Sequence, residues 1–461
     1  MSLASGSGTA QAVRCVASYN RAACAAPLLF SSTGVVIYLL LLTGGLCAEE
    51  RLCRTTNGDT FSAEPVSIAG DGDVVFAVAG GQKQVPAGVL LTWGSLSDTP
   101  DGTQVLLADG SLIVASDVQL DGESLIVRAN LFGEVDDFSI AGISRIPVST
   151  VRAVVFRVPL RGADRDALFN RIESAAGIED QLWLANGDVL KGTLAKLTRE
   201  RSGDRPGPMQ VTMTTSAGDV TIGPDEPQGK LLEKVQAVIF NPSLVRKISA
   251  DGSFMLLGLS DGSRLYVQQF DPRKKQATFK LRCGTELQSH PDEDIWRKLA
   301  SLQSFGPHVR YLSDLDPAPN SYRHTPLVGR TWPLGEDANV TGGKLRAGGK
   351  FFAKGLGMHS SSRAVYVLDQ PYARLEAELS IDESAGNSGS VNFLVAHDAG
   401  GKFQIVHKSE IIRGGDSPTF LSIDLTGARR LAIFVEPADR GDVLDRANWG
   451  SARLIPAAAG E

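Results

Sequence analysis

The stretch Lys354 to Ser362 reads KGLGMHSSS and places a histidine after two close glycines and before three hydroxyl residues. A histidine in this setting fits a catalytic base, a metal ligand, a sugar-binding group or a tight turn between strands. The chain contains no HExxH, GxSxG or P-loop motif, and its histidines lack metal-ligand spacing. We therefore interpret His359 as either a contact to a ligand or a residue that fastens a loop.

Carboxylates are the second group that could do chemistry, because a glycosidase needs an acid and a base or nucleophile on opposite sides of the glycosidic bond. The candidates are Asp382, Glu383, Asp398, Asp442 and Asp445. Beside Gly, Asn and Ser, however, such residues more often form Asx turns or hold a structural calcium. Turn formation is favoured over ligand contact, catalysis is the least favoured, and calcium stays an open alternative.

The C-terminal phrase DRGDVLDRANWGSARLI, Asp439 to Ile455, combines an aromatic ring with carboxylate and amide groups. A sugar can stack on an aromatic face while polar side chains bond its hydroxyls, and Trp449, Asn448 and Asp445 are suitable types. The competing interpretation is that Trp449 plugs one end of a sandwich.

The elements that must position these residues are mostly strands. From about Leu52 to Leu281, apolar alternation is interrupted by four Asn-Gly or Asp-Gly pairs, which predict two-residue hairpins with positive φ at both turn positions. The four segments are TTNGDTF, LLADGSLIV, LANGDVLKG and LSDGSRLYV. The phrase Val151 to Phe156 is echoed by Val235 to Phe240, which indicates a diverged duplication of small β modules.

Two segments break the strand pattern with helical spacing of apolar residues. In Asp164 to Ala176 the residues Leu168, Phe169 and Ile172 predict a short amphipathic helix. In Glu293 to Ser304 the residues Ile295, Leu299 and Leu302 predict a second helix that ends the N-terminal region.

The last third enters through an irregular arm rich in Pro, Gly and Asn and then shows six strand-like runs at short intervals. The runs are 364–368, 375–381, 390–395, 403–408, 420–425 and 430–435. This spacing, without a helical pattern, predicts a β-sandwich or jelly roll.

Four phrases in this last third, in order, resemble the NPCBM family of carbohydrate-binding modules associated with glycosyl hydrolase family 98. They are GKLRAGGKFFAKGLGMHSSS, AVYVLDQPYARLEAELSIDESAGNSGSVNFLV, DLTGARRLAIFV and GDVLDRANWGSARLI, within roughly residues 318–457. The resemblance implies a galactose-binding-like jelly roll that recognises sugars without cutting them. Its GLGxH phrase maps onto Gly355 to His359, its acidic strand end onto Asp382, and its closing DxxxW onto Asp445 and Trp449. The first two thirds resemble no assigned family.

Composition and the N-terminal residues limit the kinds of partner and the cellular location that we expect. The 461 residues carry a formal net charge of −6, which argues against a nucleic-acid partner. Arg14 and Arg21 precede an uncharged run, residues 22–48, that fits a cleavable signal and, as an alternative, a membrane anchor. Both predict a secreted or cell-envelope protein. Cys53 and Cys283 then lie in the exported part, as one disulfide or two buried thiols.

The sequence thus predicts an all-β chain in five parts: a signal or anchor at 1–48, β modules at 49–160, a helical linker at 161–178, further β modules at 179–305 ending in a short helix, and a carbohydrate-binding jelly roll at 306–461. The predicted function is non-catalytic binding of glycans at a cell surface or in an extracellular polymer. The predicted ligand contacts are His359, Asp382, Asp445, Asn448 and Trp449. The alternatives are a structural or protein-interaction module without sugar binding and, less favoured, a glycoside hydrolase.

Overall fold

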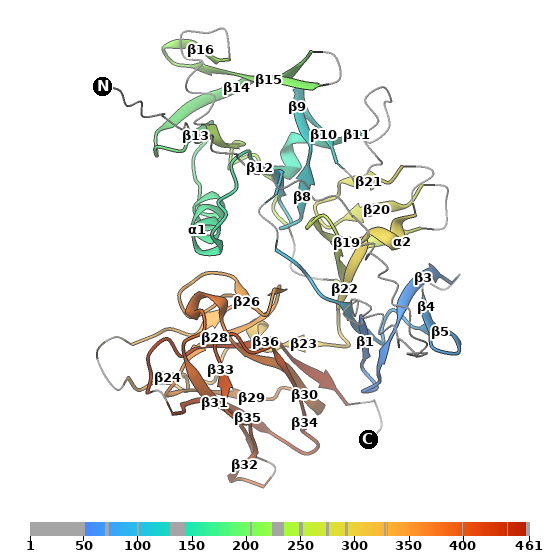
Figure 1. The fold of residues 1–461 in the computed structure, drawn as a ribbon, viewed down its shortest axis with the longest axis vertical. Coiled ribbons are helices and arrows are strands. Elements are labelled where there is room, and N and C mark those ends of the chain that lie inside the picture. Colours follow the sequence, from blue (N-terminus) through green and yellow to red (C-terminus); the bar gives the residue numbers. More distant parts are fainter. Residues whose placement is uncertain are drawn as a thin grey trace, which may run out of the picture. The chain divides into compact units, whose positions relative to one another are not determined.

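The computed structural model describes residues 51–457 except 70–72, 99–100, 130–142, 203–204, 224–234, 249–251, 273–275, 291–293, 327–328, 330, 399 and 440. The expected signal or anchor at 1–48 lies outside the described residues. Residues 49–461 form one compact unit, which Figure 1 shows in blue to red. Among the described residues no helix is long and apolar enough to cross a membrane.

The described N-terminal part is built on one sheet of 16 strands, in the order β16-β15-β14-β13-β17-β12-β7-β8-β19-β18-β22-β6-β1-β2, with β20 and β21 attached beside β19. The strands are β1 Leu52–Thr55, β2 Thr60–Ser62, β6 Leu90–Gly94, β7 Thr103–Leu107, β8 Leu112–Ala115, β12 Val151–Val155, β13 Asp180–Leu184, β14 Val189–Ser202, β15 Arg205–Thr215, β16 Gly218–Ile222, β17 Val235–Ile239, β18 Phe254–Leu259, β19 Arg264–Asp271, β20 Thr278–Leu281, β21 Glu286–Gln288 and β22 Leu299–Phe305.

Two three-stranded antiparallel sheets accompany it. One contains β3 Glu64–Ile68, β4 Val74–Val78 and β5 Gly81–Val85, and the other β9 Asp117–Asp121, β10 Ser124–Arg128 and β11 Ile143–Pro147. A shared apolar core that includes Trp93, Ile113 and Phe279 packs beneath these sheets. Cys53 and Cys283 are buried free thiols in that core, so of the two alternatives the thiols are correct. Burial raises the pKa of Cys53 to about 12 and that of Cys283 to about 11.

The four predicted hairpins are confirmed, but their turns differ from the prediction. In the β7–β8 turn Gly110 N–H donates to the Leu107 carbonyl at 3.2 Å, and Leu107 N–H donates to the Ser111 carbonyl at 2.8 Å. Only the glycine has positive φ, +88° at Gly110, while Asp109 does not. This is a three-residue loop with a type I turn and a glycine bulge. The same pattern recurs at Gly58, Gly187, Gly262 and Gly284.

The echoed phrases are neighbours in the sheet. Strands β12 and β17 pair antiparallel with Val154 opposite Val238, so the two related segments face each other across one ladder. Each strand is buried along nearly its whole length, which fits their apolar sequences, and the one polar residue in each, Arg152 and Gln236, is at the half-buried position.

One helix prediction is confirmed and the other is mostly wrong. Helix α1, Gly162–Glu173, buries Leu168, Phe169 and Ile172 as expected. Helix α2 is only Ile295–Lys298, and the chain continues as β22, whose residues are buried on both faces between β18 and β6. A strand buried on both faces shows no alternation, so its apolar residues were mistaken for a helical stripe.

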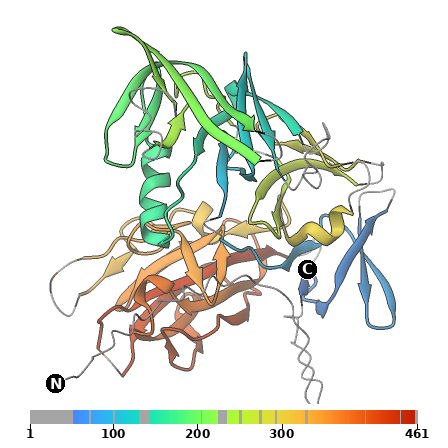
Figure 2. The ribbon, with the colours of Figure 1, turned by 45° about the horizontal axis from the view of Figure 1, so that its top comes forward.

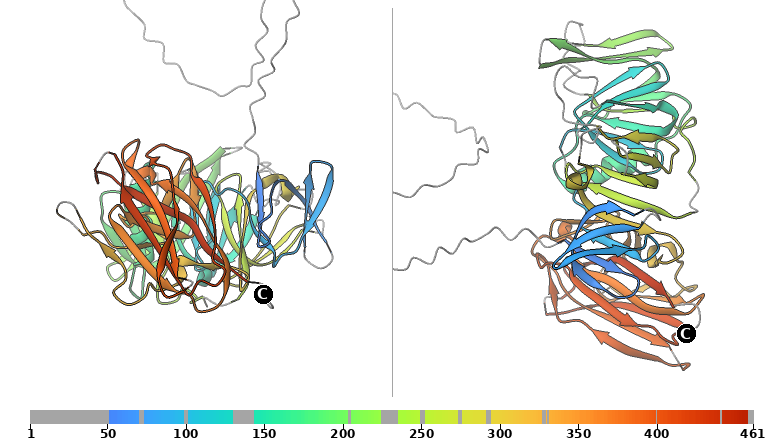
Figure 3. Two further views of the ribbon diagram at one scale, coloured as in Figure 1. Left: turned by 90° about the horizontal axis from the view of Figure 1, so that it is seen from below. Right: turned by 90° about the vertical axis from the view of Figure 1, so that its right-hand side faces the viewer.

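The C-terminal part is a sandwich of two antiparallel sheets, drawn in orange and red in Figure 3. The first sheet has the order β25-β28-β36-β30-β34 with β23 beside β36, and the second β24-β29-β35-β31-β32 with β33 beside β31. The bounds are β23 Arg310–Tyr311, β24 Arg323–His324, β25 Gly335–Glu336, β28 Gly355–His359, β29 Ser362–Val367, β30 Tyr372–Ile381, β31 Ser390–Asp398, β32 Phe403–Lys408, β33 Ile412–Arg413, β34 Thr419–Asp424, β35 Arg430–Pro437 and β36 Arg446–Pro456; β26 Leu345–Ala347 and β27 Lys350–Phe352 form a separate hairpin.

The all-β prediction with a C-terminal jelly-roll sandwich is confirmed. All six predicted runs coincide with strands, and between the two sheets lies a core of its own, including Phe393, Tyr366 and Leu454. Short 3-10 turns stand at Val148–Thr150, Leu312–Asp314 and Glu383–Ala385. Figure 2 shows α1 as the longest coiled ribbon among otherwise extended elements.

Candidate functional site

The opening phrase KGLGMHSSS forms strand β28, and its glycines are required by close backbone approach. A Cβ on Gly357 would lie 2.5 Å from the Ala338 carbonyl oxygen, and one on Gly355 would lie 2.4 Å from the Trp449 carbonyl oxygen. Gly355 also has φ +143°, which disfavours side chains. The glycines therefore allow β28 to lie tightly against the 338–339 segment and β36, with His359 at the end of the strand.

His359 belongs to a cluster of three rings contributed by separate segments. The Trp332 ring stacks on His359 with centroids 5.3 Å apart and an interplanar angle of 8°, and His324 meets His359 edge-on at 5.4 Å. The Trp332 backbone N–H donates to Nδ1 of His324 at 3.1 Å. We call His324, Trp332 and His359 the aromatic cluster. His359 is buried, while His324 and Trp332 are half-buried, so the cluster has an accessible side.

The electrostatics of the aromatic cluster favour neutral imidazoles. Burial lowers the pKa of both His324 and His359, and the charge of His324 adds to the lowering at His359. Half-buried Asp442, on the loop before β36, opposes this lowering at both rings. The cluster thus offers aromatic surface, imidazole nitrogens and a carboxylate close together.

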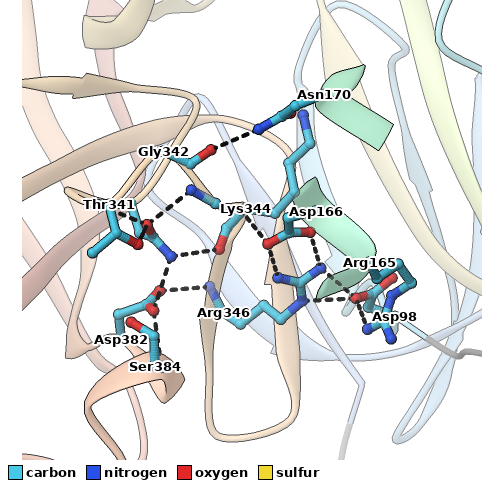
Figure 4. Close-up of polar contacts among 12 residues, drawn as sticks. Asp98, Arg165, Asp166, Asn170, Thr341, Gly342, Lys344, Arg346, Asp382 and Ser384 are labelled. Atoms are coloured by element: carbon cyan, nitrogen blue, oxygen red, sulfur yellow. Dashed lines mark hydrogen bonds and ion pairs between the residues drawn. The ribbon is translucent and has the colours of Figure 1, made fainter. Parts of the chain in front are cut away.

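Asp382 and Asn448 come together, but in a different, buried place. Asn448 Nδ2 donates to Asp382 Oδ2 at 2.8 Å, and Asp382 also accepts hydrogen bonds from Asn339 Nδ2 at 3.0 Å and the Arg346 backbone N–H at 3.2 Å. The carboxylate additionally caps the 3-10 turn through Ser384 N–H. Asp382 is 2% exposed and Asn448 0%. Their polar atoms hold the β26 hairpin against β36, as Figure 4 shows for Asp382.

The Asp382 group continues into an ionic network that joins the sandwich to the N-terminal part (Figure 4). The Arg346 guanidinium donates to both carboxylate oxygens of Asp166 on α1, at 2.6 and 2.7 Å, and to Asp98 Oδ2 at 2.7 Å. Asp98 also pairs with Arg165. Burial disfavours the charged form of both Arg346 and Asp98, but their partners outweigh it. The pKa of Arg346 is raised by Asp166 and Asp98, and the pKa of Asp98 is lowered by Arg346, Arg264 and Arg165. We call Asp98, Arg165, Asp166 and Arg346 the ionic lock.

Trp449 and Asp445 are also internal, which corrects the role predicted for the tryptophan. Trp449 is 0% exposed and meets Phe393 edge-on at 5.0 Å in the core between the sheets. Asp445, likewise 0% exposed, accepts a hydrogen bond from Ser390 N–H at 2.8 Å, and burial raises its pKa. Trp449 therefore fills the core of the sandwich, as the competing interpretation predicts, and offers no stacking face to a ligand.

Trp332 and His324 were not among the predicted ligand contacts. Both lie in the irregular arm before β28, where the chain has no periodic pattern that would indicate which side chains meet. The available signal was compositional: a tryptophan and a histidine beside Pro and Gly in an otherwise aromatic-poor arm. Two carboxylate candidates remain. Glu383 accepts a hydrogen bond from Gly349 N–H at 2.9 Å, and Asp398 pairs with Arg430 and caps a turn through Gly400 N–H and Gly401 N–H. In the described part of the chain no three His, Cys, Asp or Glu side chains are grouped to hold a metal.

Residues 308–455 match the family model described as NPCBM/NEW2 domain, so the C-terminal third is such a domain. A Renibacterium salmoninarum protein named as an endo-alpha-N-acetylgalactosaminidase is 26% identical over 123 residues, which make up 26% of this chain and 8% of that protein.

Among solved structures, a CBM51 module of a Clostridium perfringens family 95 enzyme in complex with methyl-galactose is 22% identical, with a TM-score of 0.28, over 32% of this chain and 99% of that one. The tandem CBM51 modules of a Streptococcus pneumoniae family 98 glycoside hydrolase are 15% identical, with a TM-score of 0.28, over 62% and 90% of the two chains. A C. perfringens ZmpB fragment with CBM51-2 bound to GlcNAc is 18% identical, with a TM-score of 0.29, over 54% and 44%.

Proposed function

We propose that the protein is an exported, non-catalytic glycan-binding protein and that its NPCBM/NEW2 domain binds saccharide at the aromatic cluster. One observation carries the proposal: a half-buried tryptophan is held flat on a buried histidine, and a second histidine meets that histidine edge-on. Within the sandwich the other predicted contacts are turned inward, so His359 is the one whose surroundings fit a ligand.

The chemistry of this cluster suits a sugar. The apolar C–H face of a pyranose can stack on an indole, and we take the about 0.5–1.5 kcal/mol that aromatic pairs contribute beyond area burial as the scale of this contact. Imidazole nitrogens and the Asp442 carboxylate can exchange hydrogen bonds with hydroxyls, each with a net gain of about 0.5–1.5 kcal/mol because a bond to water is replaced. Binding at one such shallow site is therefore expected to be weak.

The test measures binding of methyl-galactoside and N-acetylglucosamine to residues 49–461 by calorimetry, since these sugars occupy the similar modules named above. Trp332→Ala should weaken binding about tenfold, the loss expected for one stacking contact of about 1.4 kcal/mol. Phe403→Ala, which removes a 40% exposed ring elsewhere in the same domain, is the matched control. Equal binding by both variants would contradict the aromatic cluster as the site, and silence across a broad glycan array would contradict the function.

Export and domain limits belong to the same proposal. The uncharged run at 22–48 behind Arg14 and Arg21 supports a signal or anchor, and the separate core of residues 312–454 supports a domain beginning near residue 306. N-terminal sequencing of the protein recovered from the cell envelope and the medium tests the first point. A mature chain that still begins with residues 1–20 in the cytoplasmic fraction would contradict it.

The alternative function, a protein-interaction module, is favoured by one observation. Strand β32 lies at the end of its sheet and exposes Phe403 at 40%, Ile405 at 65% and Val406 at 41%. An edge with apolar side chains is a template for pairing with another strand. Ile405→Lys should then abolish partner binding while the Trp332→Ala variant retains it, the reverse of what glycan binding predicts.

A further inference from the structure

A cleft of about 890 Å³ lies between the N-terminal sheet and the sandwich, away from the aromatic cluster. Its lining includes Phe254, Tyr266 and Phe305 from the N-terminal strands, and Arg310 and Lys354 from the sandwich. Both halves of the protein are therefore needed to form it. Its volume falls within the range of about 300–1,000 Å³ typical of ligand sites.

Aromatic rings line the N-terminal wall and continue beyond the cleft. Phe254 and Phe305 stack with centroids 4.5 Å apart, and Tyr266 packs against Phe254 at 5.9 Å. A second, mainly apolar cavity of about 460 Å³ shares Phe254 and Phe305 with the cleft and adds Phe270 and Trp296. We call the cleft and this neighbouring cavity together the groove. Their volumes leave room for more than a single sugar ring, and aromatic side chains line both.

The Lys354 charge on the sandwich wall is compensated by two carboxylates. Lys354 Nζ pairs with Asp314 at 2.5 Å and with Asp337 at 2.7 Å, and Asp337 also accepts from Gly355 N–H. Burial lowers the pKa of Lys354 less than the two carboxylates raise it, so the pair stays charged. A wall of paired acid and base with an exposed amide at Gln370 suits hydroxyl groups, which donate and accept, better than a polyanion or polycation.

The cleft is held in shape by contacts on either side of it. The ionic lock ties α1 to the β26 hairpin, and an apolar cluster with Leu256 and Phe305 from one half and Tyr311 and Ile455 from the other packs at the boundary. A cleft whose walls are fixed in this way loses little freedom when a ligand binds.

From these observations we propose that the groove between the two halves is a second binding site, for a neutral saccharide chain. The inference does not rest on the aromatic cluster, because the two sites share no residue of their lining. It adds a role for the N-terminal β region, which would then form one wall of a binding site in addition to carrying the C-terminal domain.

The test uses residues 49–461 in native affinity electrophoresis with galactomannan, arabinogalactan and dextran in the gel. Ser253 is exposed and lines both cavities, so Ser253→Trp should block the groove. We expect at least a tenfold weaker retardation by the polysaccharide that the wild type binds. Ser216→Trp, in the exposed β15–β16 turn, is the matched control. If Ser253→Trp does not fold, the doubly substituted variant Arg310→Ala/Gln370→Ala, at two exposed lining positions, replaces it.

Each outcome decides between the two sites. Loss of retardation in Ser253→Trp with retention in Trp332→Ala supports the groove, whereas the reverse pattern overturns the groove and leaves the proposed function standing. Retardation by none of the polysaccharides overturns the inference. So does binding of a peptide library that Ser253→Trp abolishes, because the groove would then belong to polypeptide.

Discussion

The aromatic cluster and the Asp382 group, which is Asp382 with its hydrogen-bond donors, lie in the same domain. They differ in whether their polar side chains are hydrogen-bonded inside the protein or remain accessible. Asp382 accepts four hydrogen bonds inside the protein and is 2% exposed. The aromatic cluster keeps Trp332 and His324 half-buried. A polar residue beside a tryptophan in sequence is therefore weak evidence for a ligand site, because the same types also build internal networks that fix loops.

The largest effect should come from the ionic lock. Arg346→Met leaves Asp166 buried without a counter-charge and removes one of the partners of Asp98. Breaking a buried pair in this way typically costs about 3–5 kcal/mol. We expect that loss in the free energy of unfolding from urea denaturation of residues 49–461. The control Arg363→Met, at an exposed position on β29, should change stability by at most about 0.5 kcal/mol. If Arg346→Met is as stable as the control, the lock does not hold the two halves together.

A smaller effect is expected within the Asp382 group. Asn448→Ala removes one of the donors to Asp382 and should lower the free energy of unfolding by about 1–3 kcal/mol. Sugar binding per folded molecule should stay within twofold of wild type, because neither atom of this bond reaches the surface. Asn186→Ala, in an exposed hairpin turn, provides the comparison. If Asn448→Ala folded fully but lost sugar binding, the Asp382 group would belong to the binding site as well.

The aromatic cluster should also respond to pH. Burial lowers the pKa of His324 and His359, so in acid the unfolded chain binds more protons than the folded one, starting near its ordinary pKa of about 6.5. Stability is thus fully present above about pH 6.5 and falls as the pH drops toward the folded pKa values. His359→Gln should flatten the dependence of the thermal midpoint on pH between about 5 and 7, compared with His407→Gln on β32. An unchanged slope would mean that His359 titrates alike in both states.

The smallest change in stability is expected for Trp332→Ala. Its ring is half-buried and stacks on His359, so thermal denaturation should show a loss of about 1 kcal/mol or less. Its effect on binding should nevertheless exceed that of Asn448→Ala. A large loss of stability would instead show that Trp332 is a core residue, as Trp449 is.

The strands of the sandwich could be predicted because each carries a local signal. On β29, for example, buried and exposed positions alternate from Ser362 to Val367, which is the period of a strand with one face in the core. The hairpins could be predicted for the same reason, because the Asn-Gly and Asp-Gly pairs are local signals. The turn geometry could not, because the bulge depends on the hydrogen bonds of the flanking strands.

The placement of side chains could not be predicted where it depends on distant partners. Trp449 was expected at a surface because Asp445 and Asn448 flank it, but β36 lies between β28 and β30 and is buried along its length. Whether a residue on such a strand faces solvent is decided by segments about 70 to 100 positions away, such as β28 and β30. His359 similarly acquired its neighbours from an arm without periodicity.

The ionic lock has a consequence for the order in which the protein can be completed during synthesis. Asp98 and Asp166 leave the ribosome well before Arg346, their hydrogen-bond partner 180 to 248 positions later in the chain. Until then Asp166 lacks its counter-charge and has to remain hydrated, whereas Asp98 can already pair with Arg165. Closing so long a loop also adds an entropic cost that local hairpins avoid. In a ribosome-bound chain stopped before residue 346, the apolar face of α1 can pack on the N-terminal strands but its Arg346 contact is missing. Such a chain should therefore be cut by protease around α1 more readily than the complete chain.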